Sequence, residues 1–336
     1  MRLDFIRPLY ERGGPYTSVY VGALTERERA VQWAGLRGEA VRAGARIPQA
    51  LEEEALRPGP GQAVFATEHD VVLVERLAEP PRPLARFSPL PHVTPMLMRR
   101  GENVAHLRVV VDHAGAEVTV FGGGSPRSAT IEAEDWPLQK TAQGGWSQKR
   151  YERAVEETWE KNAVAVAHEI DEQVRRIGAD LVLVAGEAKS RSLVGDHLGT
   201  KSTDRMLMVE HGHRGGLGGF EHDVEAALDR WLDRRRAELL ARHREQDGPV
   251  GMTQVARALR EGRVHALLLP GELDRQVWVG EGGTQVSADD GELRDWGVEK
   301  PVAERADSAL VRAATMTDAE LWFTDQVPDV AAVLRY

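Results

Sequence analysis

The triplet Gly144-Gly145-Trp146 combines residue types that suit contact with a phosphate-rich ligand. Glycine lets the backbone bend, and an indole ring stacks on a base or a ribose with about 1–3 kcal/mol per base. Basic side chains around the triplet can pair with phosphate groups. These residues are Lys140, Lys149, Arg150 and Arg153. The pattern predicts an RNA-binding site, and it is also compatible with a surface loop in front of a helix whose charged face is solvated.

Acidic and histidine residues that could hold a metal are spread along the chain. The spacing of His211, His213 and His222 matches no zinc signature, which favours scattered surface histidines. Paired carboxylates around two metal ions are the chemistry of nucleases. The acids that could form such a site are Asp112, Glu117, Asp135, Glu187 and Asp204. Most of them fall at predicted strand ends or turns, where acids are common, so we expect no metal, no cofactor and no catalytic residue.

A long helix is predicted directly behind the triplet, within residues 139–177. Its apolar positions recur at steps of three or four residues, which is the period of one helix face. These positions are Tyr151, Val155, Trp159, Val166, Ile170, Val174 and Ile177, with Asn162 as the one polar member. Ser147 is the expected N-cap, and Gly178 is expected just past the end. About thirty residues at ~1.5 Å each make a rod of roughly 45 Å, with the triplet at its tip.

Composition bounds the class of protein. The chain has 336 residues, of which 42% are hydrophobic, and no run of about 18 apolar residues that would predict a membrane span. It has no cysteine, which excludes disulfides and cysteine-ligated zinc and fits a cytoplasmic protein. A net charge of −10 argues against wrapping of nucleic acid by the whole surface. A local basic tip remains compatible with RNA binding.

The order of the predicted elements indicates an α/β fold of three domains, each a mixed sheet with packed helices. Residues 1–100 are expected to form the first domain, with a strand, two helices, a hairpin at 61–77 and a proline-rich linker at 79–95. The second domain, 101–220, contains a hairpin at 107–123, the rod, and the buried strand 181–186. The third domain, 221–336, begins with a long linking helix and continues with alternating helices and strands.

Three stretches resemble the archaeal and eukaryotic class-one peptide-chain release factors and Pelota. They are VVVDHAGAEVTVF (109–121) with the following GGWSQKRYERAVEE, ADLVLVAGEAKSRSLV (179–194), and VARALREGRVHALLL (255–269) with the terminal VAAVLRY. Within that family the resemblance is to the bacterial branch of Balon-like ribosome hibernation factors. It covers roughly residues 100–336 and implies a release-factor-like three-domain architecture. The first domain has no NIKS-like segment of the kind that reads a stop codon.

The resemblance also implies a function. In release factors a Gly-Gly-Gln tip helps to place a water on the peptidyl ester, and here Trp146 replaces the glutamine. Tryptophan has no amide, so the fold is expected to carry over without the hydrolysis. The implied partner is the 70S ribosome, where the tip would reach the rRNA of the A site and the peptidyl-transferase centre. Elongation factor Tu is the partner implied for the third domain.

Three functions therefore follow from the sequence. The first is a hibernation factor that occupies the A site of idle or stressed ribosomes. The second is a peptide-release or ribosome-rescue factor that hydrolyses peptidyl-tRNA. The third is a metal-dependent RNase built on the acidic residues named above.

Overall fold

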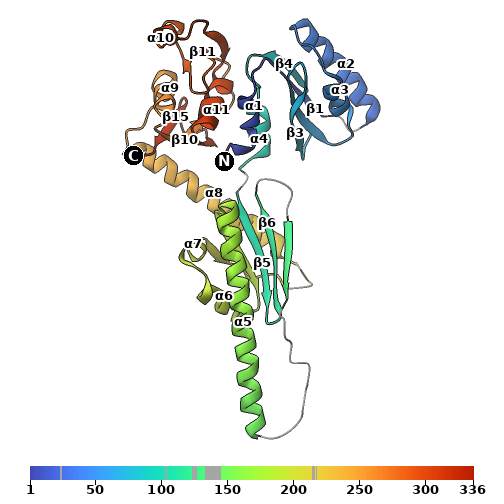
Figure 1. The fold of residues 1–336 in the computed structure, drawn as a ribbon, viewed down its shortest axis with the longest axis vertical. Coiled ribbons are helices and arrows are strands. Elements are labelled where there is room, and N and C mark those ends of the chain that lie inside the picture. Colours follow the sequence, from blue (N-terminus) through green and yellow to red (C-terminus); the bar gives the residue numbers. More distant parts are fainter. Residues whose placement is uncertain (23–24, 103, 123–126, 133–144, 214–215, 217) are drawn as a thin grey trace. The chain divides into compact units, whose positions relative to one another are not determined.

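The computed structural model describes the 336 residues except 23–24, 103, 123–126, 133–144, 214–215 and 217 (Figure 1). For residues 132 and 145–155 it describes the path of the backbone and not the side chains. Contacts within the chain divide it into two compact units. Unit 1 comprises residues 1–102 and 235–336, and unit 2 comprises residues 103–234. The predicted α/β class with mixed sheets and packed helices is confirmed, whereas the division into three domains stays a prediction.

Unit 2 is built on a five-stranded sheet with the strand order β7-β6-β5-β8-β9. The strands are β5 (His106–Asp112), β6 (Gly115–Phe121), β7 (Arg127–Glu132), β8 (Leu181–Gly186) and β9 (Met206–Met208). β5 and β6 form the predicted hairpin, with His113 and Ala114 in its turn. β8 runs parallel to β5, and a parallel pair needs a long crossover connection. The helix predicted between the two strands provides this crossover.

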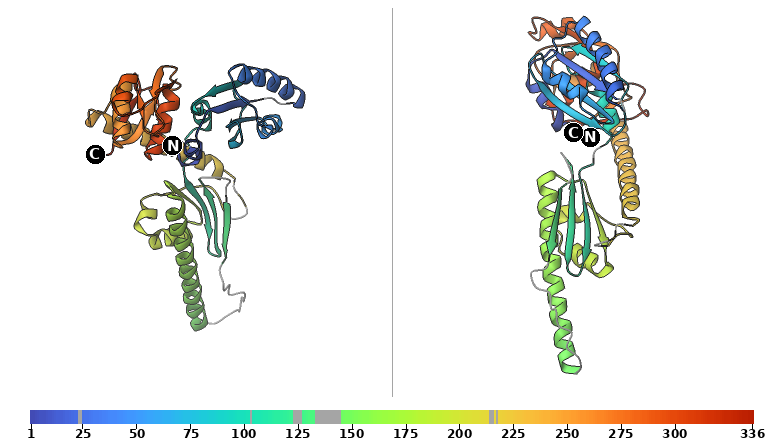
Figure 2. Two further views of the ribbon diagram at one scale, coloured as in Figure 1. Left: turned by 45° about the horizontal axis from the view of Figure 1, so that its top comes forward. Right: turned by 90° about the vertical axis from the view of Figure 1, so that its right-hand side faces the viewer.

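Helices cover both faces of this sheet, which explains why β5 and β8 read as continuous apolar runs. The helices are α5 (Gly145–Ile177), α6 (Ala188–His197), α7 (Thr200–Thr203) and α8 (Phe220–Glu245). Val109 and Val184 pack on the face of α5 and α6, and Val110 and Leu183 pack on the face of α8. Two separate cores therefore flank the sheet, and Figure 2 shows α5 and the start of α8 on opposite sides of it.

α5 is a single helix of 33 residues. It begins at Gly145, two residues before the predicted N-cap Ser147, and it ends where the sequence predicts. Gly178 has a φ of 59°, and the N–H of Ala179 donates to the carbonyl of Val174 at 3.2 Å. This left-handed glycine with its backward hydrogen bond is the usual stop signal of a helix. The amino-terminal part of α5 extends past the end of the sheet (Figure 1).

The first segment of unit 1 is a four-stranded antiparallel sheet with the order β3-β2-β1-β4. Its strands are β1 (Tyr16–Val21), β2 (Gly61–Ala66), β3 (Val71–Leu77) and β4 (Leu84–Ser88). Its helices are η1 (Asp4–Ile6), α1 (Pro8–Glu11), α2 (Glu26–Arg42), α3 (Gln49–Leu56) and α4 (Thr94–Arg100). The predicted linker at 79–95 is wrong, because β4 pairs with β1. The prolines lie outside β4, at an edge of the sheet, where they remove no ladder hydrogen bond.

The second segment of unit 1 contains two three-stranded sheets, β14-β10-β15 and β12-β11-β13. Its strands are β10 (Val264–Leu269), β11 (Gln276–Val279), β12 (Val286–Ser287), β13 (Val302–Arg305), β14 (Glu320–Phe323) and β15 (Ala331–Leu334). Its helices are α9 (Met252–Arg260), α10 (Asp290–Asp295) and α11 (Ala306–Met316). Residues 302–305 pair with β11 as a strand, and α11 begins directly after them at Ala306.

One apolar core joins the two segments of unit 1. It contains Phe65 and Met96 from the first segment and Val255 and Leu310 from the second, all fully buried. Because these residues come from opposite ends of the chain, the first and third predicted domains share one core.

Candidate functional site

The predicted RNA-binding residues lie at the start of α5 and in the stretch before it. Lys140 and Gly144 lie outside the described residues. Gly145 and Trp146 are the first two residues of α5. Lys149, Arg150 and Arg153 lie in its first three turns, where the backbone alone is described. Their role in RNA binding therefore stays a prediction.

The two ends of α5 differ in how their charges meet the helix dipole. The first turn has no acidic residue, and Lys149 and Arg150 follow within the second turn. The amino terminus of a helix has a partial positive charge, so basic residues near it are unfavourable for the helix, and the effect weakens beyond the first turn. Arg175 and Arg176 in the last turn have the favourable placement. The start of α5 is thus arranged better for attracting an anion than for helix stability.

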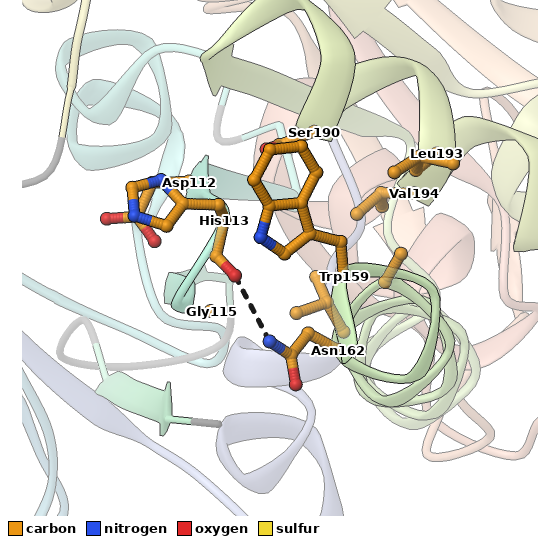
Figure 3. Close-up of a pocket in the computed structure, with 10 residues that line it drawn as sticks. Asp112, His113, Gly115, Trp159, Asn162, Ser190, Leu193 and Val194 are labelled. Carbon is orange, nitrogen blue, oxygen red and sulfur yellow. Dashed lines mark hydrogen bonds between the residues drawn. The ribbon is translucent and has the colours of Figure 1, made fainter. Parts of the chain in front are cut away.

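A small pocket marks the place where α5 meets the turn between β5 and β6 (Figure 3). Asn162, from α5, donates a hydrogen bond from Nδ2 to the carbonyl oxygen of His113 at 3.1 Å. Asn162 is the polar member of the predicted apolar stripe, and the structure gives it a specific partner. We call the group formed by His113, Trp159, Asn162 and Lys189 the arm joint.

Trp159 occupies the centre of the arm joint. Its ring lies 5.9 Å from the His113 ring between centroids, at an interplanar angle of 48°. On α6, the Nζ of Lys189 lies 4.5 Å from the centroid of the same indole, which is a cation–π distance. Lys189 also lies 3.6 Å from a carboxylate oxygen of Glu156, one turn earlier on α5. The arm joint therefore links three elements of unit 2: α5, α6 and the hairpin turn.

Glu187 sits beside the arm joint because of the glycine before it. Gly186 has a φ of 115°, and a Cβ atom there would lie 1.8 Å from the carbonyl oxygen of Val111. Only glycine allows this close approach of β8 to β5. The carboxylate of Glu187 then lies 3.5 Å from Nδ1 of His113 and accepts from the hydroxyl of Ser190 at 3.5 Å.

The size of the pocket excludes a small-molecule substrate there. Its volume is about 10 Å³, which is room for one water molecule. Pockets that bind small molecules have volumes of about 300–1,000 Å³. The arm joint is therefore a packed contact between elements and not a catalytic cleft.

The acidic residues proposed for a metal site have other partners or lie apart. Asp112 accepts the backbone N–H of Ala114 at 2.7 Å, which shapes the hairpin turn. Asp135 lies outside the described residues. In the part of the chain that the structure describes, no group of three or more His, Asp or Glu side chains is placed to hold a metal ion.

His211, one of the three histidines considered for a metal site, has a local partner on α8. Asp223 accepts the backbone N–H groups of Glu210 and His211, at 3.1 and 2.9 Å. The backbone hydrogen bond from His211 lowers the pKa of Asp223 below its ordinary value. This carboxylate thus fixes the start of α8 against residues 210 and 211.

None of the described helices is long and apolar enough to cross a membrane.

Comparison with known proteins identifies the relatives of this fold. Residues 105–249 match the family model described as bacterial archaeo-eukaryotic release factor family 2. This segment is therefore similar to the bacterial release factors. The match contains the whole of α5, the arm joint and α8, and it confirms for residues 105–249 the resemblance predicted from the sequence.

Two proteins of Mycobacterium tuberculosis are similar to this chain over its whole length. The uncharacterized proteins Rv2629, of strain H37Rv, and MT2704, of strain CDC 1551, are each 28% identical to this chain over 366 residues. Each alignment covers 100% of this chain and 97% of the relative.

Three solved structures have a low similarity to this chain. An archaeal translation termination factor, aRF1, is 16% identical with a TM-score of 0.28, covering 98% of this chain and 96% of that chain. Dom34 of S. cerevisiae is 12% identical with a TM-score of 0.40, covering 82% and 79%. Pelota of Archaeoglobus fulgidus is 11% identical with a TM-score of 0.29, covering 82% and 79%.

Sequence reasoning missed most of the arm joint. It singled out Asn162 as a polar residue on an apolar stripe, and that signal was informative. It placed Glu187 in a dispersed acidic cluster, and it gave Lys189 no role. Their partners come from elements that are distant in the sequence, so spacing alone gave no signal.

Proposed function

We propose that this protein is a ribosome-associated factor that occupies the A site of idle or stressed ribosomes and does not hydrolyse peptidyl-tRNA. The observation that carries the proposal is α5. It is a 33-residue helix within the segment that matches the release-factor family, and it opens with Gly145 and Trp146. A stiff helix with a basic start suits a narrow site lined by rRNA phosphates.

The charge distribution supports this orientation. Residues 136–151 contain three basic residues and no acidic residue, in a chain with a net charge of −10. Phosphates attract this segment and repel the acidic remainder of the protein. The start of α5 is therefore the end that would enter an rRNA crevice, with Lys149, Arg150 and Arg153 as phosphate contacts.

The third residue of the triplet supports occupancy without chemistry. Trp146 replaces the glutamine that the release-factor motif uses to place a water on the peptidyl ester. An indole has one N–H donor and no amide, so it does not position water in the same way. It is well suited to stacking on a base or a ribose of the peptidyl-transferase centre.

The partners follow from the same proposal. The 70S ribosome is the principal partner, through the rRNA of the A site and the peptidyl-transferase centre. Elongation factor Tu is the proposed partner of the carboxyl-terminal segment, residues 221–336. Binding keeps substrates away from a ribosome that is not translating.

Co-sedimentation of the purified chain with 70S ribosomes on sucrose gradients tests ribosome binding. The double variant Lys149→Gln/Arg150→Gln removes two proposed phosphate contacts. Its matched control is Arg175→Gln/Arg176→Gln, which removes the same charge from the other end of α5. We expect the first variant to lose about tenfold or more in affinity, because a hydrogen bond to a charged group contributes about 1.5–3 kcal/mol. Equal loss in both variants, or no co-sedimentation of the wild-type chain, would refute the proposal.

Peptide release from stalled ribosome complexes separates occupancy from hydrolysis. We expect no release by the wild-type chain at concentrations that saturate binding. Release that disappears on Gly145→Ala would instead identify a peptide-release or rescue factor. The variant Trp146→Gln, which restores Gly-Gly-Gln, shows whether the glutamine alone is sufficient for hydrolysis on this scaffold.

A further inference from the structure

We propose that the arm joint holds the start of α5 in one direction, and that Asn162 is the residue that positions it. Residues 145–158 of α5, here called the arm, precede the joint. The inference concerns unit 2 itself, and its consequence for ribosome binding rests on the proposed function.

The arm joint lies at the place where α5 begins to pack. Among the side chains that the structure describes on α5, Glu156 and Glu157 are exposed, Trp159 and Asn162 are half-buried, and Ala163 is buried. Among these described side chains, packing against the sheet thus starts at the joint and continues toward the carboxyl terminus. Contacts at this position control the angle at which the arm leaves the sheet.

Asn162 gives the joint its specificity. The apolar residues of the stripe fill space, and close-packed apolar contacts tolerate small rotations of a helix. A hydrogen bond has narrow limits of distance and angle. The bond from Nδ2 of Asn162 to the carbonyl of His113, at 3.1 Å, therefore fixes the rotation and height of α5 against the hairpin turn.

Lys189, on α6, gives the arm a second restraint. Lys189 contacts both the Trp159 ring, at 4.5 Å, and the Glu156 carboxylate, at 3.6 Å. One ammonium group thus bridges two successive turns of α5 to the start of α6. The turn at His113 and the helix α6 together restrain the helix on two sides.

The length of the arm magnifies any looseness at the joint. Fourteen residues at ~1.5 Å each place the tip about 21 Å from the joint, so a tilt of about 10° moves the tip by roughly 4 Å. Such a displacement exceeds the length of a phosphate hydrogen bond, which is about 2.7–2.9 Å. A positioning contact at the base is therefore needed if the tip is to meet fixed phosphates.

Spin labelling tests the inference without a ribosome. The chain has no cysteine, so Ser147→Cys on the arm and Glu117→Cys on β6 provide two unique sites for nitroxide labels. The distance distribution between the labels is measured by double electron–electron resonance. Asn162→Asp keeps the size of the side chain and removes the donor, and Trp159→Ala removes the ring. Val164→Ala, at a side chain that is 47% exposed on the same helix, is the matched control.

We expect the width of the distribution to increase at least twofold in Asn162→Asp and Trp159→Ala, and to stay unchanged in Val164→Ala. Unchanged hydrogen exchange of β5 and β8 verifies that unit 2 remains folded in these variants. An unchanged width in folded Asn162→Asp would overturn the inference.

Ribosome affinity is measured on the same variants. If the proposed function holds, a wider distribution is accompanied by at least a fivefold weaker binding to 70S ribosomes. A wider distribution together with a wild-type chain that binds no ribosome would support the arm joint and overturn the proposed function. The two failures are therefore distinguishable.

Discussion

The two halves of α5 differ in their packing and in their charge. The carboxyl-terminal half buries Val166, Ile170 and Val174 against the sheet and ends at Gly178 with a backward hydrogen bond. The amino-terminal half extends past the sheet and opens with basic residues on the unfavourable end of the helix dipole (Figure 1). One half holds unit 2 together, and the other half is the part of the helix that we propose contacts a ligand.

This difference shows how one helix can stabilise a domain with one half and, in the proposed function, contact a ligand with the other half. Most helical stability in proteins comes from packing of an apolar face and not from the helix alone. The packed half of α5 can therefore stabilise a helix whose other half has unfavourable charges. The contrast leads to predictions of opposite sign for substitutions in the two halves.

The largest effect is expected in the packed half. Ile170→Ala removes a fully buried side chain from the core between α5 and the sheet. We expect a loss of about 2–5 kcal/mol in the free energy of unfolding of unit 2, because a cavity replaces well-packed atoms. Hydrogen exchange measured by mass spectrometry should show faster exchange in β5 and β8. Unchanged protection in β10 and β15 of unit 1 is the internal control.

A second prediction concerns unit 1, where a buried histidine, and not the apolar packing of a helix, makes stability depend on pH. Burial lowers the pKa of His92 from its ordinary value of 6.5 to about 4, with Arg305 and Arg86 acting in the same direction against Asp307. The unfolded chain binds a proton below pH 6.5 that the folded chain does not bind, so folding becomes less favourable as the pH falls toward 4.

We therefore expect the protection of unit 1 to decrease between pH 6.5 and 4. The decrease should be smaller in His92→Gln, which keeps the backbone bonds of this residue to Ser18 and Tyr20. Exchange rates corrected for their intrinsic pH dependence provide the measurement. An identical pH profile in the variant would show that His92 is not the responsible group.

A smaller loss is expected at the end of the packed half. Gly178 has a φ of 59°, and a residue with a Cβ in this conformation costs about 1–2 kcal/mol. Gly178→Ala should therefore lower the midpoint of urea unfolding of unit 2 by less than Ile170→Ala does. Gly101→Ala, also at a positive φ but in unit 1, should leave the exchange of β5 and β8 unchanged. A decrease in the urea midpoint as large as that of Ile170→Ala would contradict the expectation that the end of α5 contributes less stability than its packed core.

The smallest expected effect is a gain in helix stability, whereas the substitutions above reduce stability. Lys149→Gln/Arg150→Gln removes two positive charges from the positive end of the helix dipole. We expect the start of α5 to become slightly more helical, by at most about 0.3 kcal/mol per charge because both residues lie beyond the first turn, while ribosome binding weakens. Hydrogen exchange of residues 148–156 measures the first effect, and a less protected arm would contradict the proposed trade of stability for binding.

The sequence predicted unit 2 better than unit 1. Periodicity marked α5, and Gly178 marked its end. These signals are local, since each depends on a few neighbouring residues. The prediction of a linker at 79–95 was wrong because a strand of five residues, β4, fits between the prolines of this segment. Its pairing with β1 depends on a partner more than sixty residues away.

The amino-acid sequence by itself determined the α/β class, the approximate length and the stop of α5, and the clustering of basic residues around Gly144-Gly145-Trp146. These features follow from helix period, capping and charge, which act within a few residues. The tertiary structure alone decided that residues 1–102 and 235–336 share one core. It also decided that Asn162 meets His113 and that Lys189 meets Trp159. Such contacts depend on the complementarity of surfaces far apart in the chain, and no local pattern encodes them.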